Sequence, residues 1–218
     1  MDIHFFGDPD SPIRLVQMAD RAELSEMGRE ATLVRNATGT DFCLCAYAVE
    51  DWNRELSPWA APAVYGKNGF GDGARKTLEA VLESMPQKKD LKMLIGGYSL
   101  SALFALWAVH ETDRFSGAAC ASPSAWFPGF TDYMEKRKIL TPRVYLSLGE
   151  KEEKTKNPVM ATVGTRIREI YAHLLESGTD CTLEWNEGGH FQEPTERTAK
   201  AFAWLLKKEK EKEEREEN

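Results

Sequence analysis

A serine flanked by small residues stands between an apolar run and a helix-forming run. Residues 91–95 lead into the sequence GGYSLS, which covers residues 96–101. A serine at a strand-to-helix turn has a strained backbone and needs small residues two positions to either side, and Gly97 and Ser101 are both small. The pattern predicts that Ser99 is presented as a nucleophile.

The pattern around Ser99 is imperfect, because Ser101 stands where the G-x-S-x-G turn has its last glycine. Its Cβ and hydroxyl must fit where little room is expected. A plain turn of small residues between a strand and a helix has the same appearance. The catalytic interpretation therefore depends on partners elsewhere in the chain.

A histidine in a sharp turn is the candidate general base. His190 follows two glycines directly after the last apolar run, residues 181–186, so the chain can turn and carry the imidazole into a crevice. Of the other three histidines, His110 and His173 fall in helical segments and His4 lies near the N-terminus. His190 is therefore the predicted base for Ser99.

A carboxylate that orients the imidazole can come from the acidic segment after residues 143–148. Glu150, Glu152 and Glu153 all lie there, and their spacing does not choose among them. At least two of the three belong to a solvated loop. The chain order of serine, acid and histidine is that of hydrolases with a strand-to-helix nucleophile.

An oxyanion formed at the serine needs two backbone N–H donors. The N–H of Leu100 lies at the start of the predicted helix, and a second donor is expected in the loop after Val49, near Trp52 or Asn53.

Aromatic side chains fall in several of the predicted loops on the same side of the sheet. Those proposed to wall an apolar substrate pocket are Trp59, Trp126, Phe127 and Phe191, with Trp52 as a further candidate. Packing beneath long loops is an equally good interpretation of each.

The elements that must position these residues alternate between strand and helix. Strands are expected over residues 13–18, 42–49, 91–95, 117–122, 143–148 and 181–186, and helices over 22–35, 102–110 and from 157 and 195 onward. This order predicts an α/β domain with a mostly parallel sheet and helices on both faces, whose ligands bind beyond the carboxyl ends of the strands. Residues 1–206 form this single domain, and residues 207–218 are expected to be a charged, fraying helical tail.

Composition excludes several classes of function. The 218 residues carry a net charge of -7 with basic and acidic residues interspersed, which argues against nucleic-acid binding. The N-terminus does not read as a signal peptide and no run reads as a membrane span, so a cytoplasmic protein is expected. Cys43 and Cys45 are expected to pack in the core, and no metal site is predicted.

With these residues assembled, the chain resembles the esterase family of α/β-hydrolases that includes esterase D-like, feruloyl esterase-like and enterochelin esterase-like enzymes. The segments that carry the resemblance are DWNRELSPW (51–59), GYSL (97–100), SPSAWF (122–127) and GGHF (188–191). The resemblance implies Ser99 as nucleophile, His190 as base and Glu152 as the acid, with Glu150 as the runner-up. The chain departs from this family in Ser101, in a glutamate where many relatives use aspartate, and in a shorter N-terminus, where the first antiparallel strands are expected to be missing.

The function implied is that of a serine carboxylesterase acting on a small or medium ester through an acyl-enzyme, without a cofactor. An acyltransferase using the same residues is one alternative, distinguished by how well the pocket excludes water. A degenerate hydrolase fold that serves as a binding module is another, motivated by Ser101. The sequence does not specify the substrate or the oligomeric state.

Overall fold

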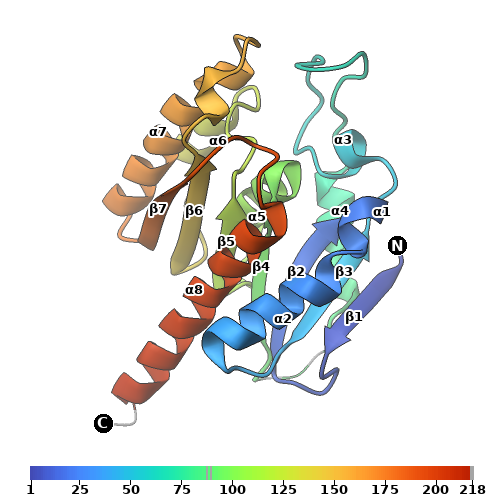
Figure 1. The fold of residues 1–218 in the computed structure, drawn as a ribbon, viewed down its shortest axis with the longest axis vertical. Helices are drawn as coiled ribbons and strands as arrows, with labels where there is room; N and C mark the ends of the chain where they lie inside the picture. The colour runs from blue at the N-terminus through green and yellow to red at the C-terminus, as the bar shows by residue number, and fades with distance from the viewer. Residues whose placement is uncertain (87, 89, 217–218) are drawn as a thin grey trace.

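The computed structural model describes residues 1–86, 88 and 90–216 and contains one seven-stranded sheet, in the order β1-β3-β2-β4-β5-β6-β7. The edge strand β1 pairs antiparallel with β3, and the other neighbouring strands are parallel (Figure 1). The strands are β1 (Ile3–Gly7), β2 (Ile13–Ala19), β3 (Cys43–Ala48), β4 (Lys92–Tyr98), β5 (Gly117–Ala121), β6 (Arg143–Gly149) and β7 (Asp180–Asn186). The predicted α/β fold with a mostly parallel sheet is confirmed.

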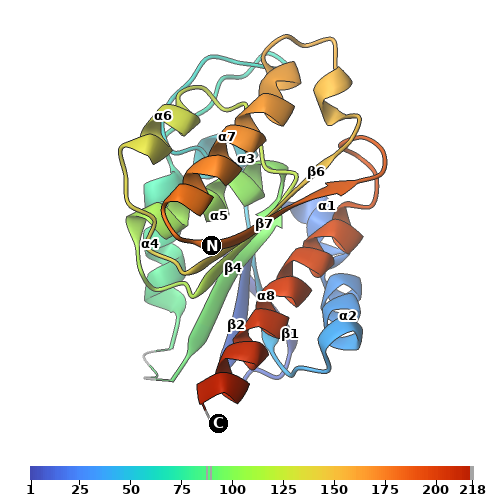
Figure 2. The ribbon, with the colours of Figure 1, turned by 90° about the vertical axis from the view of Figure 1, so that its left-hand side faces the viewer.

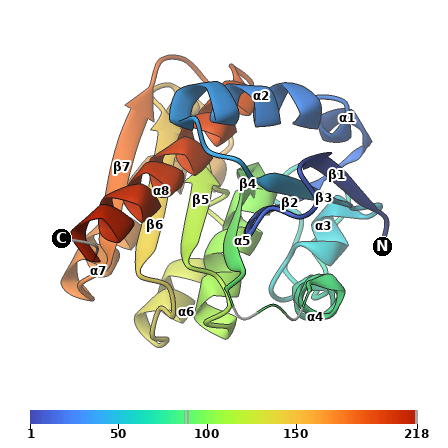
Figure 3. The ribbon, with the colours of Figure 1, turned by 90° about the horizontal axis from the view of Figure 1, so that it is seen from below.

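Helices cover both faces of the sheet. They are α1 (Arg21–Leu24), α2 (Met27–Thr38), α3 (Trp52–Glu55), α4 (Ala74–Ser84), α5 (Ser99–Glu111), α6 (Phe130–Glu135), α7 (Val163–Glu176) and α8 (Pro194–Glu216). The helices α2 and α8 lie side by side on one face, and α4 to α7 pack on the other (Figures 2 and 3). No helix of the described residues has the length and apolar composition needed to span a bilayer.

Alternation along the strands separates the two cores. In β4, Leu94 packs with α2 and α8, whereas Ile95 packs with α5 and the helices beside it. Both side chains are buried, which is why the central strands appear in the sequence as continuous apolar runs. The helix α5 is buried around most of its circumference, and this anchors the start of the helix beside Ser99.

Three features differ from the expectations. The antiparallel strand β1 is present, although the N-terminus was expected to lack such strands. The helix expected over residues 22–35 is divided in two. A capping box of Asp20 and Glu23 begins α1, which ends with Ser25 as its C-cap, whose N–H donates to the Ala22 carbonyl at 3.2 Å, and α2 begins separately at Met27.

The C-terminal segment is helical, as predicted, but one position in it is packed. Residues 207–216 continue α8, and Glu209 is buried against Arg143 at the start of β6, so this position is packed rather than frayed. The pairing of Glu209 with Arg143 joins residues far apart in the chain, so the sequence pattern did not reveal it. Residues 217 and 218, which belong to the predicted tail, lie outside the described residues.

A buried carboxyl group between β2 and α2 makes stability depend on pH. Burial raises the pKa of Glu30 from 4.5 to about 8, although Gln17 donates a hydrogen bond of 3.4 Å to it. The folded state therefore keeps a proton that the unfolded chain releases, so stability falls as pH rises from 4.5 towards 8. Glu30→Gln is expected to remove this loss. Its free energy of unfolding should exceed that of the wild type by on the order of a few kcal/mol at pH 8 and match it near pH 4.

Urea unfolding at several pH values measures this difference. Glu135→Gln, an exposed neutralisation on α6, is the matched control and should leave the pH dependence unchanged. A Glu30→Gln variant with the same pH dependence as the wild type would contradict the assignment.

Candidate active site

The turn between β4 and α5 has the geometry expected from the sequence. Ser99 has φ 57°, in the left-handed region that side chains other than glycine rarely adopt. A Cβ on Gly97 would lie 2.2 Å from Ser101 Oγ, so only glycine fits there. The hydroxyl of Ser101 donates to the carbonyl of Met18 at 2.9 Å, so this departure from the usual motif is satisfied and joins α5 to β2.

Three side chains from separate loops form a hydrogen-bonded line at the carboxyl end of the sheet. Ser99 Oγ lies 3.0 Å from His190 Nε2, and His190 Nδ1 lies 2.7 Å from Glu152 Oε2. His190 comes from the turn between β7 and α8, and Glu152 begins a short 3-10 helix, residues Glu152–Lys154, after β6. The imidazole thus contacts the hydroxyl with one nitrogen and the carboxylate with the other.

The other oxygen of the carboxylate is held from three directions. Glu152 Oε1 accepts hydrogen bonds from the Gly149 N–H at 2.7 Å, the Ser122 hydroxyl at 2.8 Å and Arg197 Nη1 at 3.3 Å. Burial alone would raise the pKa of Glu152, but the bonds from His190, Ser122 and Gly149 outweigh it and hold the pKa below its ordinary value. The carboxylate is therefore ionised and fixed in orientation.

The two other glutamates of this segment lie elsewhere. Glu150 is exposed, and Glu153 pairs with Arg168 on α7 at 3.2 Å. Only Glu152 is brought to His190 among these three acids. A 3-10 turn, which the spacing did not reveal, directs it inward.

Arg197 was missed by the sequence reasoning, although it connects the parts of the site. It is 3% exposed, and besides Glu152 its guanidinium donates to the Tyr98 hydroxyl at 3.2 Å and the Glu187 carbonyl at 2.8 Å. The Tyr98 hydroxyl in turn donates to the His190 carbonyl at 2.6 Å. Arg197 thus links the residue before the nucleophile, the carboxylate and the turn that carries the imidazole.

Arg197→Met is expected to lower kcat by roughly tenfold to a hundredfold, as loss of an orienting partner does, and to leave KM within about twofold. The variant should also be destabilised by about 3 kcal/mol, because it breaks a buried ion pair. Esterase kinetics and urea unfolding measure both, and Arg197→Lys should recover part of kcat. Lys200→Met, an exposed cation one turn along α8, is the control. A KM effect without a kcat effect would assign Arg197 to substrate binding instead.

The loop after β5 also contacts the nucleophile. The Ser124 N–H donates to the Ser99 carbonyl at 3.0 Å, and the two hydroxyl oxygens are 3.4 Å apart. Two residues further on, Trp126 and Phe127 line a groove of 410 Å³ together with Val159. Its lining is mixed, since it also contains Asp132 and Arg166, and it includes none of Ser99, His190 and Glu152.

The remaining predicted aromatic residues have different settings. Trp59 donates through Nε1 to the Pro128 carbonyl at 2.9 Å and packs on Phe127 and Phe130, behind the groove. Phe191 is 93% exposed, and its ring meets that of His190 edge to face. Phe191 is therefore placed at the mouth of the site and Trp59 in its support.

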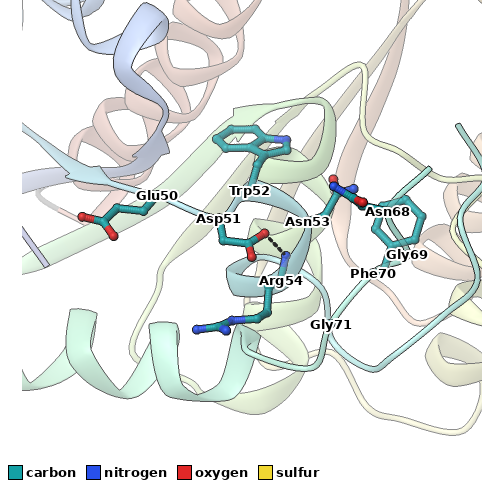
Figure 4. A pocket seen from close by; sticks show the side chains of 9 residues that line it. All are labelled: Glu50, Asp51, Trp52, Asn53, Arg54, Asn68, Gly69, Phe70 and Gly71. Carbon is teal, nitrogen blue, oxygen red and sulfur yellow. Dashed lines mark hydrogen bonds between the residues drawn. The ribbon is translucent and has the colours of Figure 1, made fainter. Parts of the chain in front are cut away.

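The loop expected to supply the second oxyanion donor lies one strand away from the nucleophile. Trp52 and Asn53 follow β3 and line a separate hollow of 690 Å³, whose lining includes none of Ser99, His190 and Glu152 (Figure 4). The strand beside β4 is β2, not β3. The geometry of the sheet therefore favours the loop after β2 for this donor.

In that loop, the N–H of Asp20 is directed to the side of β4. Ala19 bonds β3 through its carbonyl, which accepts from Val49 N–H at 3.0 Å, and the N–H of the same trans peptide group, that of Asp20, points to the opposite side. The Asp20 N–H donates to Glu23 Oε2 at 3.1 Å within the capping box. Across the sheet, Leu100 supplies an N–H in the first turn of α5, where no intrahelical acceptor exists.

Solved structures of hydrolases share this fold. They include the siderophore hydrolase EstA from Aspergillus nidulans, with 19% identity, a TM-score of 0.63 and coverage of 89% of this chain and 82% of that chain. An IroE-like serine hydrolase from Shewanella oneidensis has 13% identity, a TM-score of 0.71 and coverage of 94% and 75%. The carboxylesterase from Bacillus cereus has 14% identity, a TM-score of 0.57 and coverage of 94% of both chains. Comparisons with protein-family models and with curated proteins find no match. The chain has the α/β-hydrolase fold.

Proposed function

We propose that this protein is a serine carboxylesterase in which Ser99, His190 and Glu152 form the catalytic triad. The observation that carries the proposal is the continuous line of hydrogen bonds of 3.0 and 2.7 Å from the Ser99 hydroxyl through the imidazole to a buried carboxylate. This arrangement supplies a nucleophile, a base that removes its proton and an anion that stabilises the charged imidazole.

The reaction proceeds in two halves. Ser99 Oγ attacks the ester carbonyl carbon while His190 Nε2 accepts the hydroxyl proton. The imidazolium then protonates the departing alcohol, which leaves an acyl-Ser99 intermediate. In the second half, water gives a proton to His190 and attacks the acyl group. His190 then returns this proton to Ser99 Oγ, which releases the carboxylic acid product. No cofactor is needed.

The negative oxygen of each tetrahedral intermediate needs donors on one side of Ser99. The N–H of Leu100 is one, and the N–H of Asp20, from the loop after β2, is the second in place of Trp52 or Asn53. In this structure the Asp20 N–H donates to the Glu23 carboxylate, so this carboxylate must move aside before the N–H can donate to the oxyanion.

An ester with an apolar part suits the aromatic side chains near the nucleophile. Trp126 and Phe127 follow Ser124, which contacts Ser99, and line a groove, and the exposed ring of Phe191 next to His190 offers a further apolar surface. Two of the structural neighbours are named as siderophore hydrolases, so siderophore esters belong in a substrate screen beside simple aryl esters.

Hydrolysis is favoured over acyl transfer because the site is open to water. The His190 side chain is 24% exposed, so a water molecule can reach the imidazole that would remove its proton. The packed, hydrogen-bonded hydroxyl of Ser101 also removes the main reason to regard the chain as a degenerate binding module.

A fluorophosphonate probe tests the nucleophile without a guess at the substrate. The wild type and Ser99→Ala are incubated with the probe, and intact mass is measured after both are checked for folding. A single adduct on the wild type alone is the expected result. Absence of an adduct on folded wild type would overturn the esterase proposal.

A further inference from the structure

The neighbouring strands β4 and β5 end in the same unusual way, in a serine with a left-handed backbone. Tyr98 and Ala121 are Cα partners at the ends of these strands. Ser99 follows the first with φ 57°, and Ser122 follows the second with φ 43°. In the described part of the chain, Glu193 is the other residue besides glycine with a positive φ. The proposed nucleophile therefore has a strained counterpart on the next strand.

The backbone conformation of Ser122 is one that glycine adopts freely and other residues rarely do. A Cβ crowds the backbone at φ 43°, so a serine there costs free energy that a glycine would avoid. Strained residues of this kind cluster at functional sites, where the surrounding structure holds them. The side chain of Ser122 is therefore expected to make a contact that glycine could not supply.

That contact is with the proposed triad acid. Ser122 is fully buried, and its hydroxyl donates to Glu152 Oε1 at 2.8 Å and lies 3.4 Å from Arg197 Nη1. Glu152 uses its other oxygen, Oε2, on His190 Nδ1. Because both oxygens belong to one planar group, a rotation that broke the bond from Ser122 would also displace Oε2 from the imidazole. The Ser122 hydroxyl thus restricts the rotation of the carboxylate that orients His190.

The backbone of the segment 122–124 is anchored on both sides. The Ser122 N–H donates to the Ser147 carbonyl on β6 at 3.0 Å, and the Ser124 N–H donates to the Ser99 carbonyl at 3.0 Å. Pro123, between the two serines, has a φ that its ring restricts. The segment therefore connects the strand that precedes the acid with the nucleophile turn, and it holds the Ser122 side chain in one place.

We propose that Ser122 is a positioning residue whose hydroxyl fixes the orientation of the Glu152 carboxylate. It acts through Glu152 rather than on the substrate. This inference rests on the proposed triad and adds to it a residue of the loop after β5. When the hydroxyl is removed, Glu152 Oε1 keeps the donors Gly149 N–H and Arg197 Nη1, so the expected loss is partial.

Steady-state kinetics of Ser122→Ala and Ser122→Gly measure the contribution of the hydroxyl. Both variants should lower kcat about tenfold, as loss of an orienting partner does, and leave KM within about twofold. Glycine relieves the left-handed backbone, so Ser122→Gly should unfold at a higher urea concentration than Ser122→Ala and still show the same loss of kcat. A merely structural role would make kcat follow stability instead. Wild-type kcat in a folded Ser122→Gly would overturn the proposal.

Ser116→Ala is the matched control for these variants. It removes a serine hydroxyl that donates to the Met93 carbonyl at 3.3 Å, immediately before the other end of β5. Its kcat should stay within about twofold of the wild type. An equal loss of kcat in Ser116→Ala would assign the effect to the packing of β5 and overturn the role of Ser122.

A double variant shows whether Ser122 acts through the acid. When Ser122→Ala is added to Glu152→Gln, the rate of fluorophosphonate labelling should fall by less than a further twofold or so, because the carboxylate that Ser122 positions is gone. A further tenfold fall would give Ser122 a role independent of Glu152 and contradict the proposal.

Failure of the triad and failure of the Ser122 role give different results. A folded wild type that forms no fluorophosphonate adduct would overturn both. A wild type that is labelled, together with unchanged kcat in Ser122→Ala and Ser122→Gly, would leave the triad in place and remove only the role of Ser122.

Discussion

Ester hydrolysis is expected to fall to background when Ser99 is replaced by alanine, a loss of about a millionfold in kcat, as for nucleophiles in comparable triads. The reason is that Ser99 Oγ is the hydroxyl within 3.0 Å of the base, and alanine removes only that atom. The left-handed backbone of residue 99 is unchanged, since alanine has the same Cβ. Steady-state kinetics with p-nitrophenyl esters of increasing chain length measure the loss, and far-UV circular dichroism checks the fold.

Ser124→Ala is the matched control for this prediction, because its hydroxyl lies only 3.4 Å from that of Ser99. The imidazole bonds Ser99, so Ser124→Ala should keep the fluorophosphonate adduct. Retained turnover in Ser99→Ala, with turnover lost in Ser124→Ala, would move the nucleophile to the second serine.

The second large effect is expected for the triad acid. Glu152→Gln should lower kcat by about four orders of magnitude, because an amide nitrogen placed at Nδ1 of His190 favours the wrong tautomer. Glu150→Gln, which makes the same chemical change two residues away, should stay within about twofold of the wild type because Glu150 is exposed. Kinetics on both variants give the comparison, and a larger loss of kcat in Glu150→Gln would assign the acid to that position.

Stability must be followed alongside this comparison. Glu152 is also the partner of buried Arg197 at 3.3 Å, so Glu152→Gln weakens an internal ion pair as well as the triad. Loss of kcat with an unchanged KM and a cooperative unfolding transition would assign the effect to the triad. Loss of the cooperative transition would assign it to the fold.

Local pattern predicted most of the elements, and its errors have physical causes. The central strands are buried on both faces, so they stand out as apolar runs. The Asn157 side chain accepts from two N–H groups as an N-cap would, but it precedes a short 3-10 turn, Met160–Thr162, and α7 begins at Val163, six residues later than expected. The strand β1 was missed because Phe5 and Met1 are exposed and no alternation marks its pairing with β3. The break between α1 and α2 was missed because Asp20 and Glu23 signal the start of a helix but not its end.

The sequence by itself determined the nucleophile turn and the imidazole turn, because each depends on neighbouring residues: small side chains around Ser99 and two glycines before His190. Spacing left three glutamates open, and only the resemblance pointed to Glu152. The tertiary structure brings Glu152 alone of these three to His190, places Arg197 against it, and favours the loop after β2 over the loop after β3 for the second oxyanion donor. Those choices depend on which strands are neighbours and on which side chains face inward. Both are set by packing between residues far apart in the chain, which no local pattern encodes.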